Sequence, residues 1–286
     1  MRGKAQRFDT RQIMRLQDFE IFHYRDSALK PVAIHHHDFY EVYFFLSGYV
    51  EYRVEASVYR LEPGNLLLIS PMELHQPIIR PDREPYERIV LWINREYLEG
   101  LSTGDTSLTR CFDYARPGHT NLLQLSTIQR TSITAKLEEL VREAHGQDYG
   151  CALWAGAVLL QLMVELNRIA LQSTGGSTGQ EEPSLVSRVL AYVGEHYDKP
   201  LTLDSLAAQF YVSKYHLAHA FQQSLGTSVY HYVLLKRLMT AKQLLNSGMP
   251  PGAVSQNCGF RDYANFYRAF RSEYGLSPRE YQASGP

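Results

Sequence analysis

Four side chains in the first third of the chain can bind a cation or a polar small molecule. They are His35, His37, Glu41 and His75. Side chains alternate along a strand, so His35 and His37 would share one face and could converge with the other two. Imidazole and carboxylate ligands suit Zn, Fe, Ni or Mn. The same groups can instead hydrogen-bond an organic ligand, and purely structural or pH-sensitive histidines are the third possibility.

Aromatic residues accompany these polar groups in the sequence. They are Tyr40, Tyr43, Phe45, Tyr52 and Trp92. Aromatic faces beside polar groups suit saccharides, although some of these rings must face a core instead. We therefore predict a site for a small-molecule effector, most simply a sugar or a related compound. Its predicted contacts are His35, His37, Glu41, Tyr43, His75 and Trp92.

A second group of chemically informative residues lies near the C-terminus, where one pattern occurs twice. The first copy has Ser213, Leu217, Ala220, Phe221, Gly226, Ser228 and Tyr232, and the second has Asp262, Phe266, Ala269, Phe270, Gly275, Ser277 and Tyr281, each pair 49 residues apart. Such a repeat indicates one structural unit used twice. Ser213 and Asp262 are good helix N-caps, and each copy reads as a helix-turn-helix, a motif typical of DNA binding.

The outward faces of the two second helices predict the DNA contacts. The predicted residues are Lys214, Tyr215, Ala218, His219 and Gln222 in the first unit, and Arg261, Tyr263, Ala264, Asn265, Tyr267, Arg268 and Arg271 in the second. Arg268 can pair with guanine and Asn265 with adenine, while Arg271 or Lys214 can hold phosphates. A connecting helix over 228–246, roughly 27 Å long, would place the two units about one DNA turn apart.

The elements that must position the first group are short strands between Phe19 and Asn94. Predicted strands cover Glu41–Gly48, Tyr49–Tyr59, Leu66–Ser70 and Arg88–Ile93. Their spacing suggests a small antiparallel barrel or jelly roll. Two amphipathic helices follow, over Thr127–His145 and Cys151–Leu171. Their apolar stripes either pack on the barrel or pair between subunits of a homodimer.

Composition divides the chain into two halves. Residues 172–183 (QSTGGSTGQEEP) read as a flexible linker. Residues 184–286 contain 10 Lys and Arg but 6 Asp and Glu, whereas the rest of the chain contains 19 Lys and Arg and 24 Asp and Glu. This modestly basic C-terminal half suits double-stranded DNA. We therefore expect a barrel over 1–125, a helical pair over 126–171, the linker over 172–183 and a DNA-binding domain over 184–286.

The remaining features favour a cytoplasmic protein. The three cysteines, Cys111, Cys151 and Cys258, have no metal-site or disulfide spacing. The N-terminus lacks the apolar core of a signal peptide. Two charges and two amides within 151–171 argue against a membrane span.

The stretch from Leu201 to Tyr281 resembles the double helix-turn-helix domain of AraC/XylS-type bacterial transcription regulators. The matching motifs are Leu206-Ala207, then Arg237, Leu238 and Ala241 in the connecting helix, then Gly259-Phe260, and the closing G-x-S-P-x-E-Y from Gly275 to Tyr281. The chain departs from the family at Val229, where proline is usual, and at Ser255, where alanine is frequent. Ala218 and His219 stand at the family's base-contact positions but read bases poorly, so the resemblance implies that the second unit carries more of the specificity.

The segment HHHDFYEVYFFLSG, from His35 to Gly48, resembles the first motif of the cupin barrels. The segment from Pro63 to His75 resembles the second, although Ser70 and Met72 replace its usual Pro and Gly. In metal cupins the three histidines and the glutamate bind a divalent ion, which would be His35, His37, Glu41 and His75 here. AraC-type regulators often carry this barrel without metal, as an effector-binding domain.

Together these features predict an α+β protein: a cupin-like β-barrel, a helical pair, a linker and an all-α domain with two helix-turn-helix units. The predicted function is a ligand-responsive, sequence-specific DNA-binding transcription regulator that is not an enzyme. We expect no obligatory cofactor. The alternative is a metal-dependent cupin enzyme or metal sensor fused to a DNA-binding domain.

Overall fold

The computed structural model describes residues 13–27, 32, 34–55, 57–71, 73–79, 85–113, 116, 119–172 and 184–284. The chain forms two compact units, one of residues 1–180 and one of residues 181–286, with the short segment 55–57 grouped with the second. The predicted linker lies outside the described residues except for Gln172, which ends a helix.

The first unit contains two antiparallel sheets. Its strands are β1 (Phe19–Asp26), β2 (Tyr40–Ser47), β3 (Val50–Val54), β4 (Ser57–Arg60), β5 (Leu66–Ile69), β6 (His75–Ile79), β7 (Tyr86–Ile93) and β8 (Leu122–Leu123). One sheet has the order β1-β7-β2-β5-β8 and the other β4-β3-β6. The predicted antiparallel all-β architecture is therefore confirmed. The described part of the chain has no continuous hydrogen-bond ladder between the two sheets, so closure of the barrel is not confirmed.

Alternation along β2 gives the larger sheet two different faces. Tyr40, Val42 and Phe44 belong to one apolar core, and Tyr43 and Phe45 to another. The first core also contains residues of two long helices. The second lies between the two sheets, since it unites Tyr43 with residues of β3, and we call this side of the larger sheet the inner face. Tyr40 therefore does not share the side of Tyr43, because the two are three positions, an odd number, apart on one strand.

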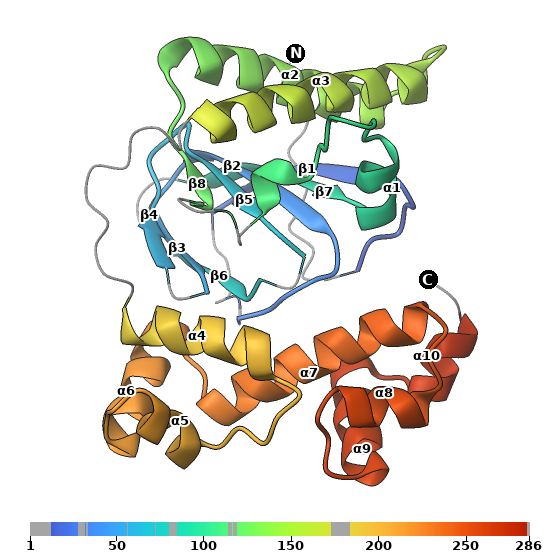
Figure 1. Cartoon of the computed structure of the whole chain (residues 1–286). Coiled ribbons are helices and arrows are strands. Elements are labelled where there is room, and N and C mark those ends of the chain that lie inside the picture. Colours follow the sequence, from blue (N-terminus) through green and yellow to red (C-terminus); the bar gives the residue numbers. More distant parts are fainter. Residues whose placement is uncertain are drawn as a thin grey trace. The chain divides into compact units, whose positions relative to one another are not determined.

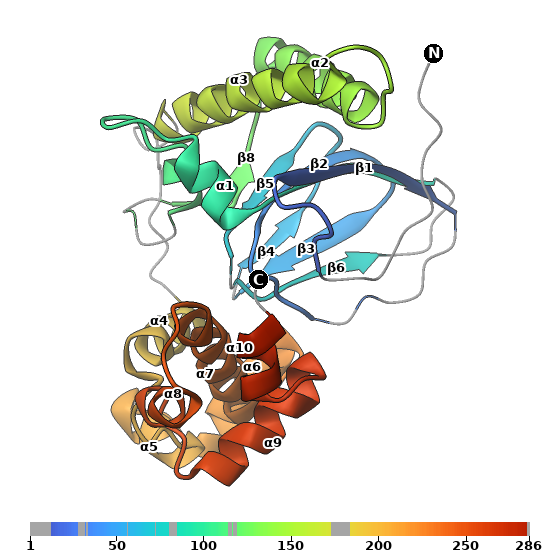
Figure 2. The same ribbon diagram turned by 90° about the vertical axis from the view of Figure 1, so that its right-hand side faces the viewer.

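The two helices before the linker cover the outer face of the larger sheet (Figures 1 and 2). They are α2 (Thr127–Ala144) and α3 (Cys151–Gln172), close to their predicted bounds. Ser126 and Gln129 form a capping box that fixes the start of α2. A short helix α1 (Arg95–Gly100) and a 3₁₀ turn η1 (Arg110–Phe112), neither of them predicted, connect β7 with β8.

Between residues 184 and 284 the only regular secondary structure is helical. The helices of the second unit are α4 (Leu185–His196), α5 (Leu203–Gln209), α6 (Lys214–Leu225), α7 (Val229–Asn246), α8 (Pro251–Asn257), α9 (Tyr263–Tyr274) and α10 (Pro278–Ser284). Helices α5 and α6 form the first predicted helix-turn-helix, and α8 and α9 form the second. Helix α7 joins them, as Figure 1 shows.

The predicted caps are present in both helix-turn-helix units. Ser213 accepts a hydrogen bond from the backbone N–H of His216, and Asp262 accepts one from Asn265. Gly226 and Gly275 end α6 and α9 in the left-handed conformation, which glycine adopts without steric cost. The local chemistry that repeats every 49 residues therefore marks the ends of both second helices.

Candidate effector site and DNA-binding face

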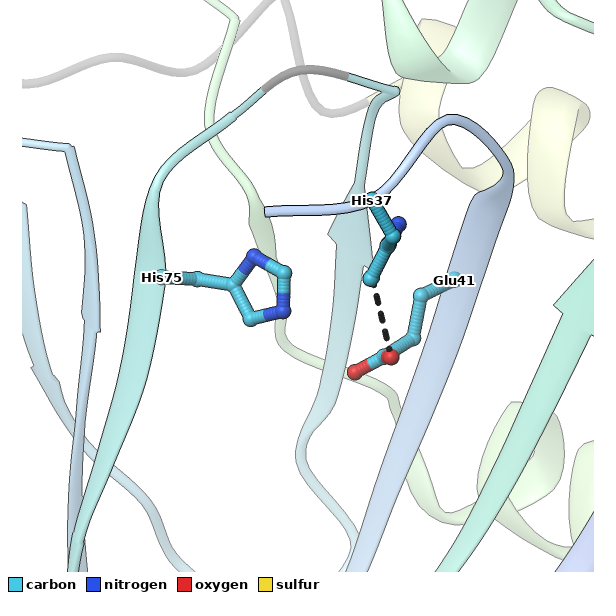
Figure 3. A group of neighbouring side chains, drawn as sticks. All are labelled: His37, Glu41 and His75. Carbon is cyan, nitrogen blue, oxygen red and sulfur yellow. Dashed lines mark hydrogen bonds and ion pairs between the residues drawn. The ribbon is translucent and has the colours of Figure 1, made fainter. Parts of the chain in front are cut away.

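Glu41 is the centre of a buried polar cluster on the inner face of the first unit. It lies on β2 and is only 5% exposed. The indole Nε1 of Trp92, on β7, donates to its Oε2 at 2.8 Å, and the Tyr52 hydroxyl donates to its Oε1 at 3.3 Å. His37 Nε2 lies 3.2 Å from the same Oε2 (Figure 3). Three side chains from separate segments thus converge on one carboxylate.

The histidines predicted for this site are brought together by an isolated strand pairing. His35 and His75 exchange backbone hydrogen bonds of 3.1 and 2.9 Å. The ring centroids of His35 and His37 lie 4.2 and 4.7 Å from that of His75. His37 and His75 are buried, whereas His35 is half-buried. The rings of His35 and His37 therefore both lie beside that of His75, although residues 36 and 37 are not in a strand. Ligand atoms of His37, Glu41 and His75 lie within 4.8 Å of one another, and His35 is not part of this group among the described residues.

Burial and neighbouring charges set the protonation states in this cluster. Burial opposes ionisation of Glu41, but the His37 hydrogen bond and the charges of His37 and His35 outweigh it, so the pKa of Glu41 lies below its ordinary value. Burial, followed by the charges of His35 and His37, holds the pKa of His75 well below its ordinary value. Glu41 is thus an anion and His75 a neutral imidazole at neutral pH.

A second polar group occupies the same inner face and was missed from the sequence. Arg88 forms a buried ion pair with Asp26 and lies over the rings of Tyr24 and Tyr86, at 4.8 and 4.2 Å. Tyr43, a predicted effector contact, is hydrogen-bonded to Tyr86, and burial raises the pKa of Tyr86 to about 12. Alternation along β7 places residues 86, 88 and 92 on one side of that strand, which is the signal that could have identified Arg88.

The predicted DNA contacts lie on the outward sides of α6 and α9, except Arg261, which precedes the N-cap of α9. Lys214, Tyr215, Ala218, His219, Gln222, Arg261, Tyr263, Ala264, Asn265, Arg268 and Arg271 are exposed, and Tyr267 is half-buried. The opposite sides carry the core residues Leu217 and Phe221 of α6, and Phe266 and Phe270 of α9, all fully buried. Each helix therefore keeps one polar face in solvent, as a recognition helix requires.

On α9 the side chains predicted to read bases are linked to one another. Asn265 donates through Nδ2 to Asp262 at 2.6 Å and accepts from Arg268 at 2.6 Å. Arg271 donates to the Tyr267 hydroxyl at 3.2 Å. The chain Asp262–Asn265–Arg268 limits the rotamers of Arg268 before any DNA is present, which reduces the entropy cost of binding.

Two residues of the family motifs brace the segment between α4 and α5. The guanidinium of Arg237, on α7, donates to the carbonyl oxygens of Tyr197 and Lys199 at 2.8 and 2.7 Å. Gly259 has a φ of +71°, and a Cβ there would lie 2.2 Å from the carbonyl oxygen of Asp198. Only glycine fits this close approach, which ties the turn of the second helix-turn-helix to the first half of the domain.

Comparisons with known proteins agree with this architecture. An AraC-like ligand binding domain matches residues 20–163, and a helix-turn-helix domain matches residues 206–284. The ligand-binding match spans both sheets and α2, and the second match spans both recognition helices. The chain belongs to the AraC-type family of ligand-responsive transcription regulators, which bind DNA.

Similar proteins include a full-length relative and two separate DNA-binding domains. The HTH-type transcriptional activator RhaS of Salmonella arizonae is 25% identical over 273 residues, which are 89% of this chain and 92% of that protein. The C-terminal domain of AraT, a response regulator from Geobacillus stearothermophilus, is 30% identical with a TM-score of 0.35, over 36% of this chain and 88% of that one. The DNA-binding domain of AdpA in complex with a target DNA is 28% identical with a TM-score of 0.35, over 36% and 93%.

Among the described residues, one helix, α3, has the length and apolar composition needed to cross a membrane. Its buried side chains, Leu159, Leu162, Met163 and Leu166, belong to the core shared with the larger sheet. A helix with one face in such a core can be as long and apolar as a membrane span, and packing accounts for the apolar residues on the buried side of α3.

Proposed function

We propose that this regulator responds to a saccharide or a related polyhydroxylated molecule, bound on the inner face of the first unit. The observation that carries the proposal is the buried carboxylate of Glu41, to which Trp92 and Tyr52 donate hydrogen bonds. A carboxylate accepts hydrogen bonds from sugar hydroxyls, and the adjacent aromatic faces pack against the apolar side of a sugar ring. His35, His37, Tyr43 and His75 complete the proposed contacts.

The proposed mechanism is a population shift rather than catalysis. The effector stabilises one arrangement of a homodimer, and that arrangement holds the two DNA-binding units at the spacing of one pair of half-sites. Within each unit α6 and α9 enter successive major-groove segments, with Arg268 and Asn265 reading bases. This function places the protein in the cytoplasm with the DNA and requires no turnover of the effector.

A thermal-shift screen of the purified full chain against monosaccharides and sugar acids tests the effector class. A compound at 100 times its Kd stabilises the native state by about 2.7 kcal/mol. We expect such a shift with one sugar or a small set of related sugars, and its loss in Glu41→Ala. If no sugar shifts the melting of the first unit while the protein still selects DNA from a random pool, the saccharide assignment is wrong.

The helix α3 is the proposed dimer contact. Its exposed leucines, Leu153, Leu160 and Leu171, are 84, 41 and 38% exposed. They are 7 and 11 residues apart, so they form one stripe on the side of the helix away from the core. An apolar stripe of this kind is stabilised by pairing with a second copy of itself.

A further inference from the structure

The turn of the first helix-turn-helix contains a tyrosine that the fold does not require. Tyr211 has a φ of +55° and is one of two non-glycine residues with a positive φ among the described residues. A residue with a Cβ is strained in this left-handed region. The Tyr211 side chain is 95% exposed and has no hydrogen bond or ring contact with any described residue. We propose that Tyr211 is a DNA contact, whose hydroxyl donates to a backbone phosphate beside the groove that α6 enters.

The backbone of this turn would be the same with glycine in place of the tyrosine. The N–H groups of Tyr211 and Val212 donate to carbonyl oxygens in the last turn of α5, at 3.2 and 3.0 Å. Those of Gly259 and Phe260 donate to the last turn of α8 in the same way, at 3.0 and 3.1 Å. Both pairs form the Schellman motif, in which glycine is the usual left-handed residue. The hydrogen bonds of the turn therefore do not account for Tyr211.

Packing within the second unit does not account for it either. Phe210, the residue before Tyr211, packs edge-on against Tyr192 with ring centroids 5.7 Å apart. In the other turn Phe260 lies 5.1 Å from Phe266. Each turn thus has one aromatic ring that packs on its own unit, and Tyr211 is an additional ring in solvent. A strained conformation without a gain in packing indicates a role in function rather than in folding.

The position of Tyr211 in the motif suggests what it contacts. It lies in the turn between α5 and α6 (Figure 1), two residues before Ser213, the N-cap of α6. In a helix-turn-helix the N-terminal residues of the second helix contact base edges, whereas the first helix crosses the phosphate backbone. The turn that joins them therefore passes the edge of the groove, where the nearest acceptors are phosphate oxygens. Tyrosine hydroxyls are among the groups that donate to phosphates.

The distribution of charge gives such a hydroxyl a purpose in the first helix-turn-helix. The predicted DNA contacts there include one lysine and no arginine, whereas those of the second helix-turn-helix include Arg261, Arg268 and Arg271. The one lysine, Lys214, has its Nζ 3.5 Å from Asp204 Oδ1, so part of its charge is already balanced within the protein. A neutral donor adds a phosphate contact where cations are few.

Tyr211→Phe tests the hydrogen bond, because it removes the hydroxyl and keeps the ring and the backbone. The probe is a DNA site that the full chain selects from a random pool. We expect about three- to tenfold weaker binding, with an equal loss on random DNA, since phosphates carry no sequence information. Tyr149→Phe is the matched control, because Tyr149 is fully exposed and lies outside the DNA-binding unit. Equal affinities of Tyr211→Phe and the wild type would overturn the proposal.

The dependence of binding on salt distinguishes a neutral donor from a cation. Each phosphate that a lysine or arginine neutralises adds about one to the slope of log K against log salt concentration. Tyr211→Phe should therefore lower the affinity and leave the slope unchanged, whereas Lys214→Gln should reduce the slope by about one. A reduced slope in Tyr211→Phe would mean that the substitution displaces a cation, and would contradict a direct contact by the hydroxyl.

Tyr211→Gly separates a DNA contact from a structural role. It removes the backbone strain, so the urea midpoint of the second unit should rise, and it removes the ring, so DNA binding should weaken at least as much as in Tyr211→Phe. A substitution that acted only through the fold would not stabilise the protein and weaken binding together. A more stable Tyr211→Gly that binds DNA as tightly as the wild type would show that the ring is not a DNA contact, which leaves a protein partner as the alternative.

Ethylation of single phosphates in the selected site identifies the contacted group. An ethyl group on a phosphate weakens the binding of a protein that contacts it. We expect interference at one phosphate per bound DNA-binding unit to disappear in Tyr211→Gly, while interference at the other phosphates remains. Identical interference patterns for Tyr211→Gly and the wild type would exclude the proposed contact.

Discussion

At the scale of single residues, the side chains proposed to bind the effector and DNA are oriented by hydrogen bonds within the protein. Glu41 is fixed by hydrogen bonds from Trp92 and Tyr52, and Arg268 by its hydrogen bond to Asn265. Rigid donors and acceptors lose less entropy on binding than mobile ones. The proposed effector site and the proposed base contacts therefore share one feature, which is a side chain oriented by hydrogen bonds; the first is buried and the second is exposed.

Substitution of Arg268 by alanine tests the predicted base contact. We expect Arg268→Ala to weaken binding to a selected DNA site by about 1–3 kcal/mol and to relax specificity at one base position. Competition binding against random DNA measures the difference. Arg279→Ala is the control, because Arg279 is an exposed arginine on α10, outside the proposed DNA-binding face. An equal loss on selected and random DNA would assign Arg268 to a phosphate instead.

Thiol labelling reports on the burial of the three cysteines, which are all free. Burial raises the pKa of the Cys111 and Cys258 thiols to about 12, and both are at most 1% exposed. Thiolate is the reactive species, so we expect both to react only after unfolding. Cys151, at the start of α3, is half-buried and should react first in native buffer. Mass spectrometry after timed alkylation distinguishes the sites, and rapid native labelling of Cys258 would contradict the packing of α8.

At the scale of elements, the two helix-turn-helix units have different residues at the left-handed position of the turn. The turn between α8 and α9 uses Gly259 at a φ of +71°, whereas the turn between α5 and α6 uses Tyr211 at a φ of +55°. A residue with a Cβ is strained in this left-handed region. Tyr211 is 95% exposed, so its side chain gains little packing in compensation.

Separate substitutions of these two turn residues should change the free energy of unfolding in opposite directions. Tyr211→Gly relieves a left-handed backbone and should stabilise the second unit by about 1 kcal/mol. Gly259→Ala introduces a Cβ against the Asp198 carbonyl and should destabilise it by about 1–3 kcal/mol. Urea unfolding followed by far-UV circular dichroism measures both changes. Stabilisation by Gly259→Ala would mean that the segment between α4 and α5 does not pack there.

At the scale of the whole molecule, α3 has two different apolar sides. One side belongs to the core with α2 and the larger sheet, and the other presents the leucine stripe. In the proposed mechanism, effector binding to the first unit changes the equilibrium between two DNA-binding states of a dimer. The size of this change is limited by the difference between the effector's affinities for the two states.

Placing a charge in the leucine stripe should dissociate the dimer. We expect Leu160→Glu to shift the protein to monomer and to weaken binding to paired half-sites by at least about tenfold, since avidity is lost. Light scattering coupled to size exclusion measures the mass. Ile128→Glu is the control, because Ile128 is 83% exposed and lies on α2 rather than α3. A dimer that persists in Leu160→Glu would place the interface elsewhere.

The sequence by itself determined the elements whose signals are local. Caps at Ser213 and Asp262, left-handed glycines and apolar spacing are sufficient for the double helix-turn-helix, since each acts over a few residues. The same holds for the bounds of α2 and α3. The sequence also supplied the outward residues of α6 and α9, because helical periodicity fixes which side is exposed.

Only the tertiary structure decided which distant groups meet. Strand register brings Trp92 and Tyr52 onto Glu41, and places Arg88 with Asp26. It also puts Tyr40 on the helix-covered side, away from Tyr43. These pairings join residues up to 62 positions apart, and no local pattern encodes them, because register depends on how whole sheets bury their apolar faces.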